Sequence, residues 1–287
     1  MSRVAYVNGR YTPLREASVH IEDRGYQFAD GIYEVCIVVG GRFYDFDGHF
    51  ERYERSLREL RMAAPIGRPA LEIVIRQLLK KNCLRDALVY IQVTRGVAPR
   101  NHAFPVDEIE PALIITARRF NLNESDAKAR RGVKVITQPD IRWGRVDIKT
   151  VGLLPNALAK QAASEAGAAE ALLVRDGFVT ECSASNAWIV DKSGALITHP
   201  KGNQILGGIT RQTTIACAEE LQIRVEERPF TIEEAKAAPE AFLTSATSFV
   251  MPIIAIDEAV IGSGAPGPVA TRLREAYKAR VRAAKLP

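Results

Sequence analysis

A lysine in apolar surroundings is the first side chain of this sequence that could do covalent chemistry. Lys149 lies in VDIKTVGLLPN, at the end of a strand-like stretch and just before an apolar one, whereas most other lysines have polar neighbours. A low-dielectric environment disfavours the charged ammonium, and the free amine is a nucleophile that forms Schiff bases with carbonyl compounds. A lysine on a solvent-facing strand gives the same pattern, so both interpretations stay open on spacing alone.

Two other segments have the composition of anion sites. The sequence LGGITR over residues 206–211 places two glycines before a predicted helix with Thr210 as its N-cap. A helix N-terminus offers unpaired N–H groups to a phosphate. The sequence LTSATS over residues 243–248 is a predicted strand that runs into small hydroxyl residues, which can donate several hydrogen bonds to an anion. Ordinary polar loops share these compositions, so neither segment is specific alone.

Charged side chains near turns supply three further candidates. Glu181 ends a predicted hairpin strand in VTECSASNAWIV, and Arg52 is the last residue of HFER, in the first turns of a predicted helix. The loop RGVAPRNH over residues 95–102 carries two arginines and a histidine. Planar guanidinium groups bind carboxylates in a two-pronged manner, so this loop has the composition of a carboxylate site. Solvent exposure is the alternative for each of these side chains.

The elements that must position these residues follow from the hydrophobic periodicity. In the first half, Asn8-Gly9 predicts a hairpin, and a helical period begins after Asp47, which is expected to be an N-cap. A second helix is predicted over residues 70–82. The strands predicted in this half cover residues 4–7, 32–39, 42–46, 88–94 and 112–117.

The second half alternates strands and helices after a polar segment without a strand pattern. Strands are predicted over residues 133–137, 171–174, 178–180, 187–190, 195–198, 224–226, 241–244 and 253–256, and helices over residues 156–166, 210–221 and from 269. Hairpins mixed with helices predict an α+β fold of two lobes. We expect a smaller N-terminal α/β domain over residues 1–118, a linker over residues 119–131 and a larger C-terminal domain over residues 132–287 that carries Lys149.

Composition excludes several classes of protein. Hydrophobic residues make up 47% and charged residues 25% of the chain, as in ordinary globular proteins. No apolar run approaches the roughly 20 residues of a membrane span, and the start MSRVAYVNGR lacks the apolar stretch of a signal peptide. We therefore expect a cytoplasmic protein that does not associate with membranes.

The distribution of charge and of metal-binding side chains limits the kinds of ligand that we expect the protein to bind. The net charge of +5 comes from interspersed residues, with neither the basic stripe nor the reading motif of a nucleic-acid-binding protein. A small anionic ligand fits this balance better. The four cysteines and four histidines are scattered, so we expect reduced cysteines and no metal site.

Taken together, these residues are the parts of a pyridoxal-phosphate enzyme: an amine, an acid for the ring nitrogen and donors for a phosphate. The sequence resembles the fold-type IV pyridoxal-phosphate aminotransferases, and among them the D-amino acid aminotransferases. The resemblance runs over nearly the whole chain and is most specific in DRGYQFADGIYEV, DIKTVGLLPNALAKQ, TECSASNAW, ILGGITR and SATSFVMPI. TRGVAPRNH marks the subgroup, because branched-chain aminotransferases and aminodeoxychorismate lyases typically lack this arginine–histidine loop.

The resemblance implies a role for each candidate. Lys149 would bind pyridoxal 5′-phosphate through a Schiff base and move the proton at the substrate Cα, and Glu181 would keep the ring nitrogen protonated. Leu206 would pack against the ring. The groups implied in phosphate binding are Arg52, the backbone amides of Ile209 and Thr210, and the Ser245–Ala246 turn. The implied ligands of the substrate α-carboxylate are Tyr33, Arg100 and His102, the last two supplied by the neighbouring subunit of a homodimer.

Two positions depart from the pattern of the family. Many relatives have threonine where this chain has Ala246, which removes one hydroxyl donor to the phosphate, and many have an acid where Phe249 stands. The implied activity is transamination between D-alanine and 2-oxoglutarate, which yields pyruvate and D-glutamate. A branched-chain L-amino acid aminotransferase, an (R)-amine transaminase and an aminodeoxychorismate lyase are the alternatives on the same fold.

Overall fold

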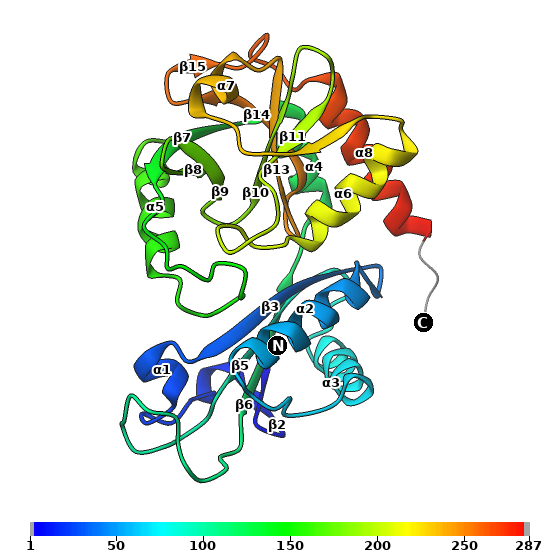
Figure 1. Cartoon of the computed structure of the whole chain (residues 1–287). Helices are drawn as coiled ribbons and strands as arrows, with labels where there is room; N and C mark the ends of the chain where they lie inside the picture. Colours follow the sequence, from blue (N-terminus) through cyan, green and yellow to red (C-terminus); the bar gives the residue numbers. More distant parts are fainter. Residues whose placement is uncertain (1–2, 284–287) are drawn as a thin grey trace. The chain divides into compact units, whose positions relative to one another are not determined.

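The chain divides into two compact units in a computed structural model that describes residues 3–283 (Figure 1). Unit 1 comprises Met1–Asn121 and Ile148–Gly152, and unit 2 comprises Leu122–Asp147 and Leu153–Pro287. The outer ends of the two expected domains, residues 1–2 and 284–287, lie outside the described residues. No helix in the described part of the chain is long and apolar enough to cross a membrane.

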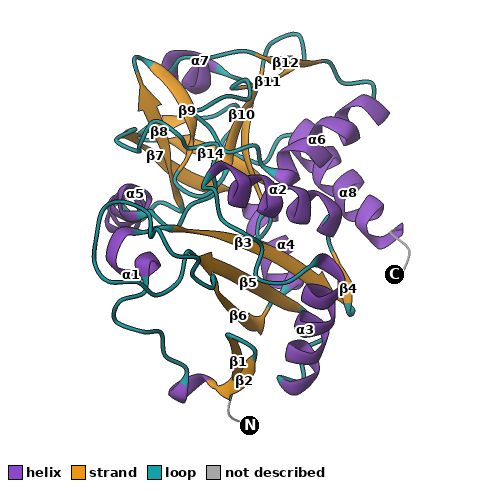
Figure 2. Cartoon of the chain, turned by 60° about the horizontal axis from the view of Figure 1, so that its bottom comes forward, coloured by secondary structure: helices purple, strands orange, loops and turns teal. Residues whose placement is uncertain are grey.

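The sheet of unit 1 has six strands in the order β2-β1-β6-β5-β3-β4, and all neighbours pair antiparallel (Figure 2). The strands are β1 (Val4–Val7), β2 (Arg10–Pro13), β3 (Gly31–Val39), β4 (Arg42–Phe43), β5 (Ala87–Thr94) and β6 (Ala112–Arg119). The predicted N-terminal hairpin is confirmed, with Asn8 and Gly9 both at positive φ, as a two-residue turn of this type requires.

Two amphipathic helices and the sheet enclose the core of unit 1. The helices of this unit are α1 (Arg24–Phe28), α2 (Phe46–Glu59) and α3 (Arg68–Lys81), and a 3₁₀ turn covers Leu14–Glu16. Tyr53 of α2 and Ile75 of α3 pack in one cluster with Cys36 of β3 and Ile115 of β6. The expectation that residues 42–46 form a strand and that Asp47 caps the helix was wrong. The strand ends at Phe43, and Asp45, in the left-handed region at a φ of +49°, is the N-cap of a helix that begins at Phe46.

Unit 2 is built on a sheet of nine strands in the order β12-β11-β10-β13-β14-β7-β8-β9, with β15 paired to β14. The strands are β7 (Val133–Pro139), β8 (Glu170–Arg175), β9 (Phe178–Cys182), β10 (Asn186–Val190), β11 (Leu196–Thr198), β12 (Val225–Glu227), β13 (Glu240–Ser245), β14 (Phe249–Ile256) and β15 (Ala259–Val260). Three pairs are parallel, namely β7 with β14, β7 with β8 and β11 with β12. All strands predicted for this half are present, and the fold class α+β is confirmed.

The helices of unit 2 are α4 (Leu122–Arg131), α5 (Leu154–Glu165), α6 (Ile209–Glu220), α7 (Ile232–Ala237) and α8 (Pro268–Ala283). The structure differs from the expected domain division because α4 occupies most of the expected linker. This helix is mostly polar and has one buried side. Ala129 is buried there, and Asp126 pairs with Arg274 and Lys278 of α8. The chain therefore changes unit at the start of this helix, between Asn121 and Leu122.

A second difference concerns Lys149, which was expected in the C-terminal domain. Residues 148–152 return to unit 1 and lie along the start of β3. Tyr33 N donates to Lys149 O at 3.0 Å, Val151 N donates to Gly31 O at 3.0 Å, and Ile32 forms an isolated bridge with Thr150. These backbone bonds satisfy the edge of β3 and fix the lysine on the sheet of unit 1.

Candidate active site

The amine of Lys149 lies against an aromatic ring of unit 1. Its Nζ is 4.0 Å from the centre of the Tyr33 ring, and the ring in turn stacks on Tyr90 of β5 at 5.7 Å. Tyr33 and Glu34 point to opposite faces of β3, since side chains alternate along a strand. The segment 148–152 thus brings together the predicted cofactor lysine and one predicted substrate residue, and Lys149 is half-buried there.

Arg52 is held by a buried carboxylate that sequence analysis did not single out. Its Nε and Nη2 donate to Glu34 at 2.6 and 2.8 Å, and His49 Nδ1 lies 2.9 Å from the same carboxylate. His49, Arg52 and Ser56 share one face of α2 because they are three and four residues apart. Burial opposes ionisation of Glu34, but the Arg52 charge and its hydrogen bonds hold the pKa of Glu34 well below its usual range. An acid inside the apolar run GIYEVCIVV was the available signal.

Arg100 and His102 both contact the Phe28 ring of α1. The Arg100 guanidinium is 5.1 Å from the centre of that ring, and the His102 ring is 5.4 Å from it. Both side chains are exposed. Neither makes a hydrogen bond or ion pair with Tyr33 or Lys149 in the part of the chain that the structure describes. The structure of this chain therefore brings Arg100 and His102 close to each other, but not to the other two predicted residues.

In unit 2, Glu181 is buried at the end of β9 and bonded on both oxygens. Oε1 pairs with Arg142, while Oε2 accepts from Asn186 Nδ2 at 2.8 Å and from Leu206 N at 3.1 Å. Asn186 Nδ2 also donates to Leu206 O at 2.8 Å. The backbone of Leu206 and the carboxylate of Glu181, two predicted cofactor residues, are therefore locked together through Asn186.

The Arg142 guanidinium bridges Glu181 to a second buried acid, Asp140. Arg142 Nε and Nη2 each donate to Asp140 at 2.8 Å, and Thr180 Oγ1 donates to the same carboxylate at 2.8 Å. Burial opposes ionisation of Asp140, but these donors lower its pKa to about 2. Burial also opposes the charge of Arg142, yet the two carboxylates raise the pKa of Arg142 above its ordinary value. Asp140, Arg142 and Glu181 thus form one buried network of charged side chains.

The start of α6 has the properties of an anion site. Gly208 is the N-cap, so no side chain caps the first turn, and Ile209 and Thr210 follow as the first buried helical residues. The predicted N-cap Thr210 was therefore wrong by two residues. A Cβ on Gly208 would lie 2.0 Å from Asn186 Oδ1, so glycine lets the helix start approach the Glu181 network. First-turn N–H groups without a side-chain cap attract phosphates.

The Ser245 turn meets the same end of the sheet. Asn186 is directly opposite Thr244 in the antiparallel pair of β10 and β13, and Ser245 is the next residue along β13. Ser248 N donates to Ser245 Oγ at 3.2 Å, which closes the turn over Ala246. One end of β10 and β13 in unit 2 therefore collects the residues expected around the ring and phosphate, which are Glu181, Leu206, Ile209, Thr210, Ser245 and Ala246.

The predicted site residues thus form two sets, one in each unit. Unit 1 holds Lys149, Tyr33, Arg52, Arg100 and His102. Sequence reasoning missed the side chains that hold these residues in place. Glu34 holds Arg52 in unit 1, whereas Arg142 and Asp140 hold Glu181 in unit 2. An acid and an arginine two residues apart in PDIRWGR were the only signal for the second pair.

Comparison with known proteins gives consistent matches. Residues 31–256 match the family model described as amino-transferase class IV. A D-alanine aminotransferase of Staphylococcus haemolyticus is 40% identical over 95% of this chain and 95% of the relative. A D-alanine aminotransferase of Bacillus licheniformis is 40% identical over 94% of each. The structure is similar, with a TM-score of 0.84 and 26% identity, to the branched-chain aminotransferase of the archaeon Thermoproteus uzoniensis with norvaline, covering 98% of this chain and 95% of that one.

Proposed function

The chain belongs to the class IV aminotransferase family, and from that premise we propose that it transfers the amino group of D-alanine to 2-oxoglutarate. The products are pyruvate and D-glutamate, and the cofactor is pyridoxal 5′-phosphate. The assignment of D-alanine as the substrate rests on the match over 94–95% of the chain to D-alanine aminotransferases. The loop with Arg100 and His102 supports it, because both side chains meet on Phe28 as a pair of cationic or hydrogen-bonding groups.

The residues of unit 2 fit the cofactor on three observations. The first turn of α6 has no side-chain cap, and Gly208 stands where any Cβ would strike Asn186. Ser185 Oγ, between Glu181 and Asn186 in sequence, is buried without a hydrogen-bond partner among the described residues. Uncapped N–H groups and an unpaired buried hydroxyl are donors that an anionic ligand satisfies.

We assign the proton transfers to two residues. When bound, pyridoxal 5′-phosphate supplies a carbonyl carbon that accepts the amino group and a ring that stabilises negative charge at the substrate Cα. With the cofactor bound, the Lys149 amine would act as the general base that takes the proton from the substrate Cα, hold it as an ammonium, and deliver it to the carbon that carries the amino group. Glu181, fixed by Arg142 and Asn186, keeps a proton on the ring nitrogen. Arg52, the α6 amides and the Ser245–Ala246 turn hold the phosphate.

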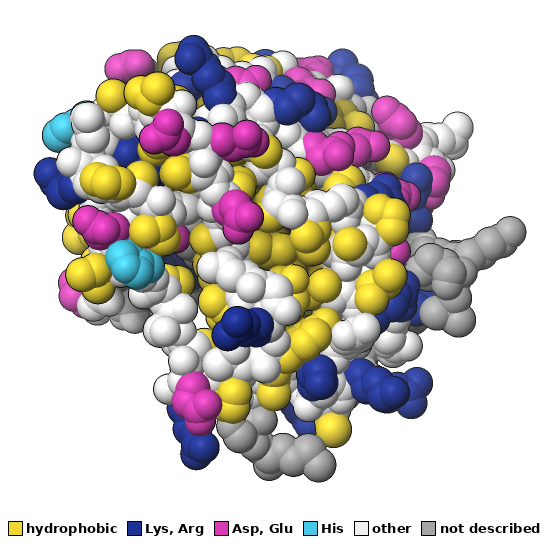
Figure 3. Space-filling view, turned by 90° about the horizontal axis from the view of Figure 1, so that it is seen from below, with side chains coloured by type: hydrophobic (Ala, Val, Ile, Leu, Met, Phe, Trp, Pro, Cys, Tyr) yellow, Lys and Arg dark blue, Asp and Glu magenta, His cyan; other side chains and the backbone are white. Residues whose placement is uncertain are grey.

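The α-carboxylate of the substrate is assigned to Tyr33, Arg100 and His102. The position of the carboxylate decides which Cα–H faces the lysine, so these groups set the preference for the D enantiomer. The protein is proposed to act as a homodimer in the cytoplasm. Large apolar side chains in the connection between β5 and β6 are exposed, among them Val97, Phe104 and Val106. Figure 3 shows hydrophobic side chains in contact with solvent on the face seen from below, as expected of a surface that a second subunit covers.

The absorption spectrum of the purified protein tests both the cofactor and the substrate. We expect a visible band from bound pyridoxal 5′-phosphate that changes on addition of D-alanine alone and returns on addition of 2-oxoglutarate. L-leucine should leave the band unchanged. A protein that binds no pyridoxal 5′-phosphate, or whose band responds to neither amino acid, would refute the proposed function.

A branched-chain L-amino acid aminotransferase is the second candidate. The similarity to the Thermoproteus uzoniensis enzyme favours it, because the fold agrees over nearly the whole chain. The same spectrum separates the two candidates, since a response to L-leucine and none to D-alanine selects the branched-chain enzyme.

A further inference from the structure

We infer that Arg24 is a positioning residue that fixes the loop carrying Arg100 and His102, and so helps to set the substrate preference. The inference rests on the proposed function for its consequence in catalysis. The contacts that carry it lie within unit 1 alone. The loop runs from the end of β5 to the start of β6, over residues 95–111.

Arg24 binds the loop backbone on both sides of His102. Its Nη1 donates to Asn101 O at 2.6 Å and to Ala103 O at 3.4 Å, and these carbonyls lie on either side of His102 in the chain. The backbone N of Arg24 donates to Gly96 O at 2.9 Å. The guanidinium is only 3% exposed, so these bonds are shielded from water and strong for their kind.

Asp30 orients Arg24 and a second arginine at the base of the loop. Arg24 Nε and Arg95 Nε both donate to Asp30 Oδ2 at 2.8 Å, and Arg95 Nη2 donates to Asp30 Oδ1 at 3.0 Å. The Phe104 ring lies 3.7 Å from the Arg95 guanidinium and 5.8 Å from that of Arg24. Burial opposes ionisation of Asp30, but the two arginines lower its pKa. The loop is therefore held at Asn101, Ala103 and Phe104.

The platform under Arg100 and His102 belongs to the same helix as Arg24. Phe28 lies four residues after Arg24, so both side chains share one face of α1. The Arg24 guanidinium is 4.8 Å from the centre of the Phe28 ring, on which Arg100 and His102 also rest. A shift of Arg24 thus moves both the backbone that carries the two substrate residues and the ring that supports them.

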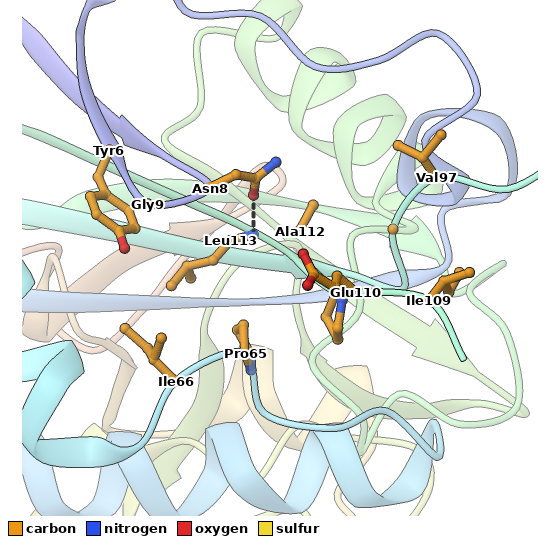
Figure 4. A pocket seen from close by; sticks show the side chains of 12 residues that line it. Tyr6, Asn8, Gly9, Pro65, Ile66, Val97, Ile109, Glu110, Ala112 and Leu113 are labelled. Carbon is orange, nitrogen blue, oxygen red and sulfur yellow. Dashed lines mark hydrogen bonds between the residues drawn. The ribbon is translucent and has the colours of Figure 1, made fainter. Parts of the chain in front are cut away.

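The base of the loop is held to the segment before α1 by backbone contacts, where Ala98 N donates to Glu22 O at 3.3 Å and Val97 forms an isolated bridge with Asp23. Gly96, Val97, Ile109 and Glu110, which are residues of its two stems, line an open pocket of about 510 Å³ next to Asn8 and Pro65 (Figure 4). Gly96 has a φ of +109°, and a Cβ there would lie 2.2 Å from Glu110 O. The stems thus cross closely beside this hollow. Beyond the base, the part of the loop that carries Arg100 and His102 is held by the Arg24 bonds to Asn101 O and Ala103 O.

The test replaces Arg24 by lysine, which keeps one positive charge for Asp30 but cannot span both the carboxylate and the two carbonyls. We expect amide hydrogen exchange over residues 97–110 to become about 10-fold faster. We also expect KM for D-alanine to rise roughly 10- to 100-fold, with a small change in kcat and a smaller ratio of D- to L-alanine efficiency, because the carboxylate ligands are displaced. A purely structural role would not move KM and the enantiomer ratio together.

Two further variants make the result decisive. Phe104→Ala removes only the half-exposed ring between the arginines, so it tests the same loop if Arg24→Lys fails to fold. Arg68→Lys is the control, because Arg68 also pairs with carboxylates and lies over the Phe46 and Phe50 rings but contacts no residue of the loop. We expect Arg68→Lys to leave exchange in the loop and the enantiomer ratio unchanged.

The outcomes separate this inference from the proposed function. Unchanged exchange in the loop of both Arg24→Lys and Phe104→Ala overturns the inference, whatever the enzyme acts on. Faster exchange with an unaltered KM and enantiomer ratio overturns the role in substrate preference. A wild-type protein that does not turn over D-alanine refutes the proposed function, while the exchange data still decide whether Arg24 holds the loop.

Discussion

Asp140→Asn should destabilise unit 2 because it breaks the charged network behind Glu181. The Asp140 side chain is completely buried and accepts from Arg142 and from Thr180. Arg175 lies 3.1 Å from its Oδ1. Asparagine keeps the shape but loses the charge, and its NH₂ group turns a donor toward groups that are themselves donors. The buried Arg142 then retains only Glu181 as a carboxylate partner.

The magnitude follows from two separate considerations. Breaking one side of a buried ion pair typically costs about 3–5 kcal/mol, and the remaining pair with Glu181 places this case at the lower end, about 3 kcal/mol at pH 7. The pKa of Asp140 falls from 3.8 to about 2 on folding. This difference corresponds to roughly 2 kcal/mol of stability from ionisation alone. Because the folded pKa is the lower one, that contribution is complete above about pH 4 and is lost as the pH falls toward 2.

Urea unfolding followed by tryptophan fluorescence measures the effect directly, because both tryptophans of the chain, Trp143 and Trp188, belong to unit 2. We expect Asp140→Asn to lower the free energy of unfolding at pH 7 and to flatten its decline between pH 4 and pH 2. Asp176→Asn, at the exposed hairpin turn between β8 and β9, is the matched control and should change stability by less than about 0.5 kcal/mol. Equal stability of wild type and Asp140→Asn at pH 7 would refute the proposed energetic role of the network.

The remaining predictions concern the residues proposed to act on the substrate. Lys149→Ala should abolish transamination and the visible absorbance of covalently bound cofactor, and a variant that kept this absorbance would show that another lysine binds it. Glu181→Gln should retain bound cofactor yet slow turnover at saturating substrates, because a neutral amide does not hold a proton on the ring nitrogen; unchanged turnover would remove Glu181 from the site. Arg100→Ala should lower kcat/KM for D-alanine roughly 10- to 150-fold, the effect of losing a charged contact of ~1.5–3 kcal/mol, and should reduce the preference for D- over L-alanine. Amines without a carboxylate should be spared, and a variant with the wild-type ratio for the two alanine enantiomers would contradict the assignment of the loop.

The strands of this protein could be predicted because their signals are local. Asn8-Gly9 predicted a hairpin, and Asp176-Gly177 is the same kind of signal between the strands predicted over residues 171–174 and 178–180; both hairpins are present. Helix starts were less predictable, because they depend on packing. Asp45, at a φ of +49°, precedes α2, and Gly208, where a Cβ would strike Asn186, precedes α6. The helix α7 was missed although it carries a complete capping box between Thr231 and Glu234, which is a signal visible in the sequence.

The sequence proposes the candidate site residues by type, but it does not indicate which side chains hold each of them. The motif around Lys149 indicated the lysine, whereas its place in unit 1 depends on backbone bonds to Gly31 and Tyr33 far away in the sequence. Glu34 and Arg142 follow the same principle. Their importance comes from partners that pair with them in space, and no periodicity in the chain indicates such pairs. The segment expected to be a linker is a helix for a similar reason. The polar residues of α4 resemble those of a linker in sequence, and only the pairing of Asp126 with Arg274 of α8 shows that the segment is packed.

Phe249, which departs from the family pattern, combines a strained backbone with a buried ring. It follows the Ser245 turn with a φ of +56°, a conformation that costs a non-glycine residue roughly 1–2 kcal/mol. Its ring is fully buried, 5.3 Å from Tyr277 and 5.4 Å from the Arg274 guanidinium, and burial of a phenylalanine contributes about 1.5–3 kcal/mol. Arg274 in turn donates to Ser248 O and Val250 O at 2.6 and 2.7 Å. Phe249, where many relatives carry an acid, therefore acts here through packing, because its ring contacts join the turn proposed to hold the phosphate to α8.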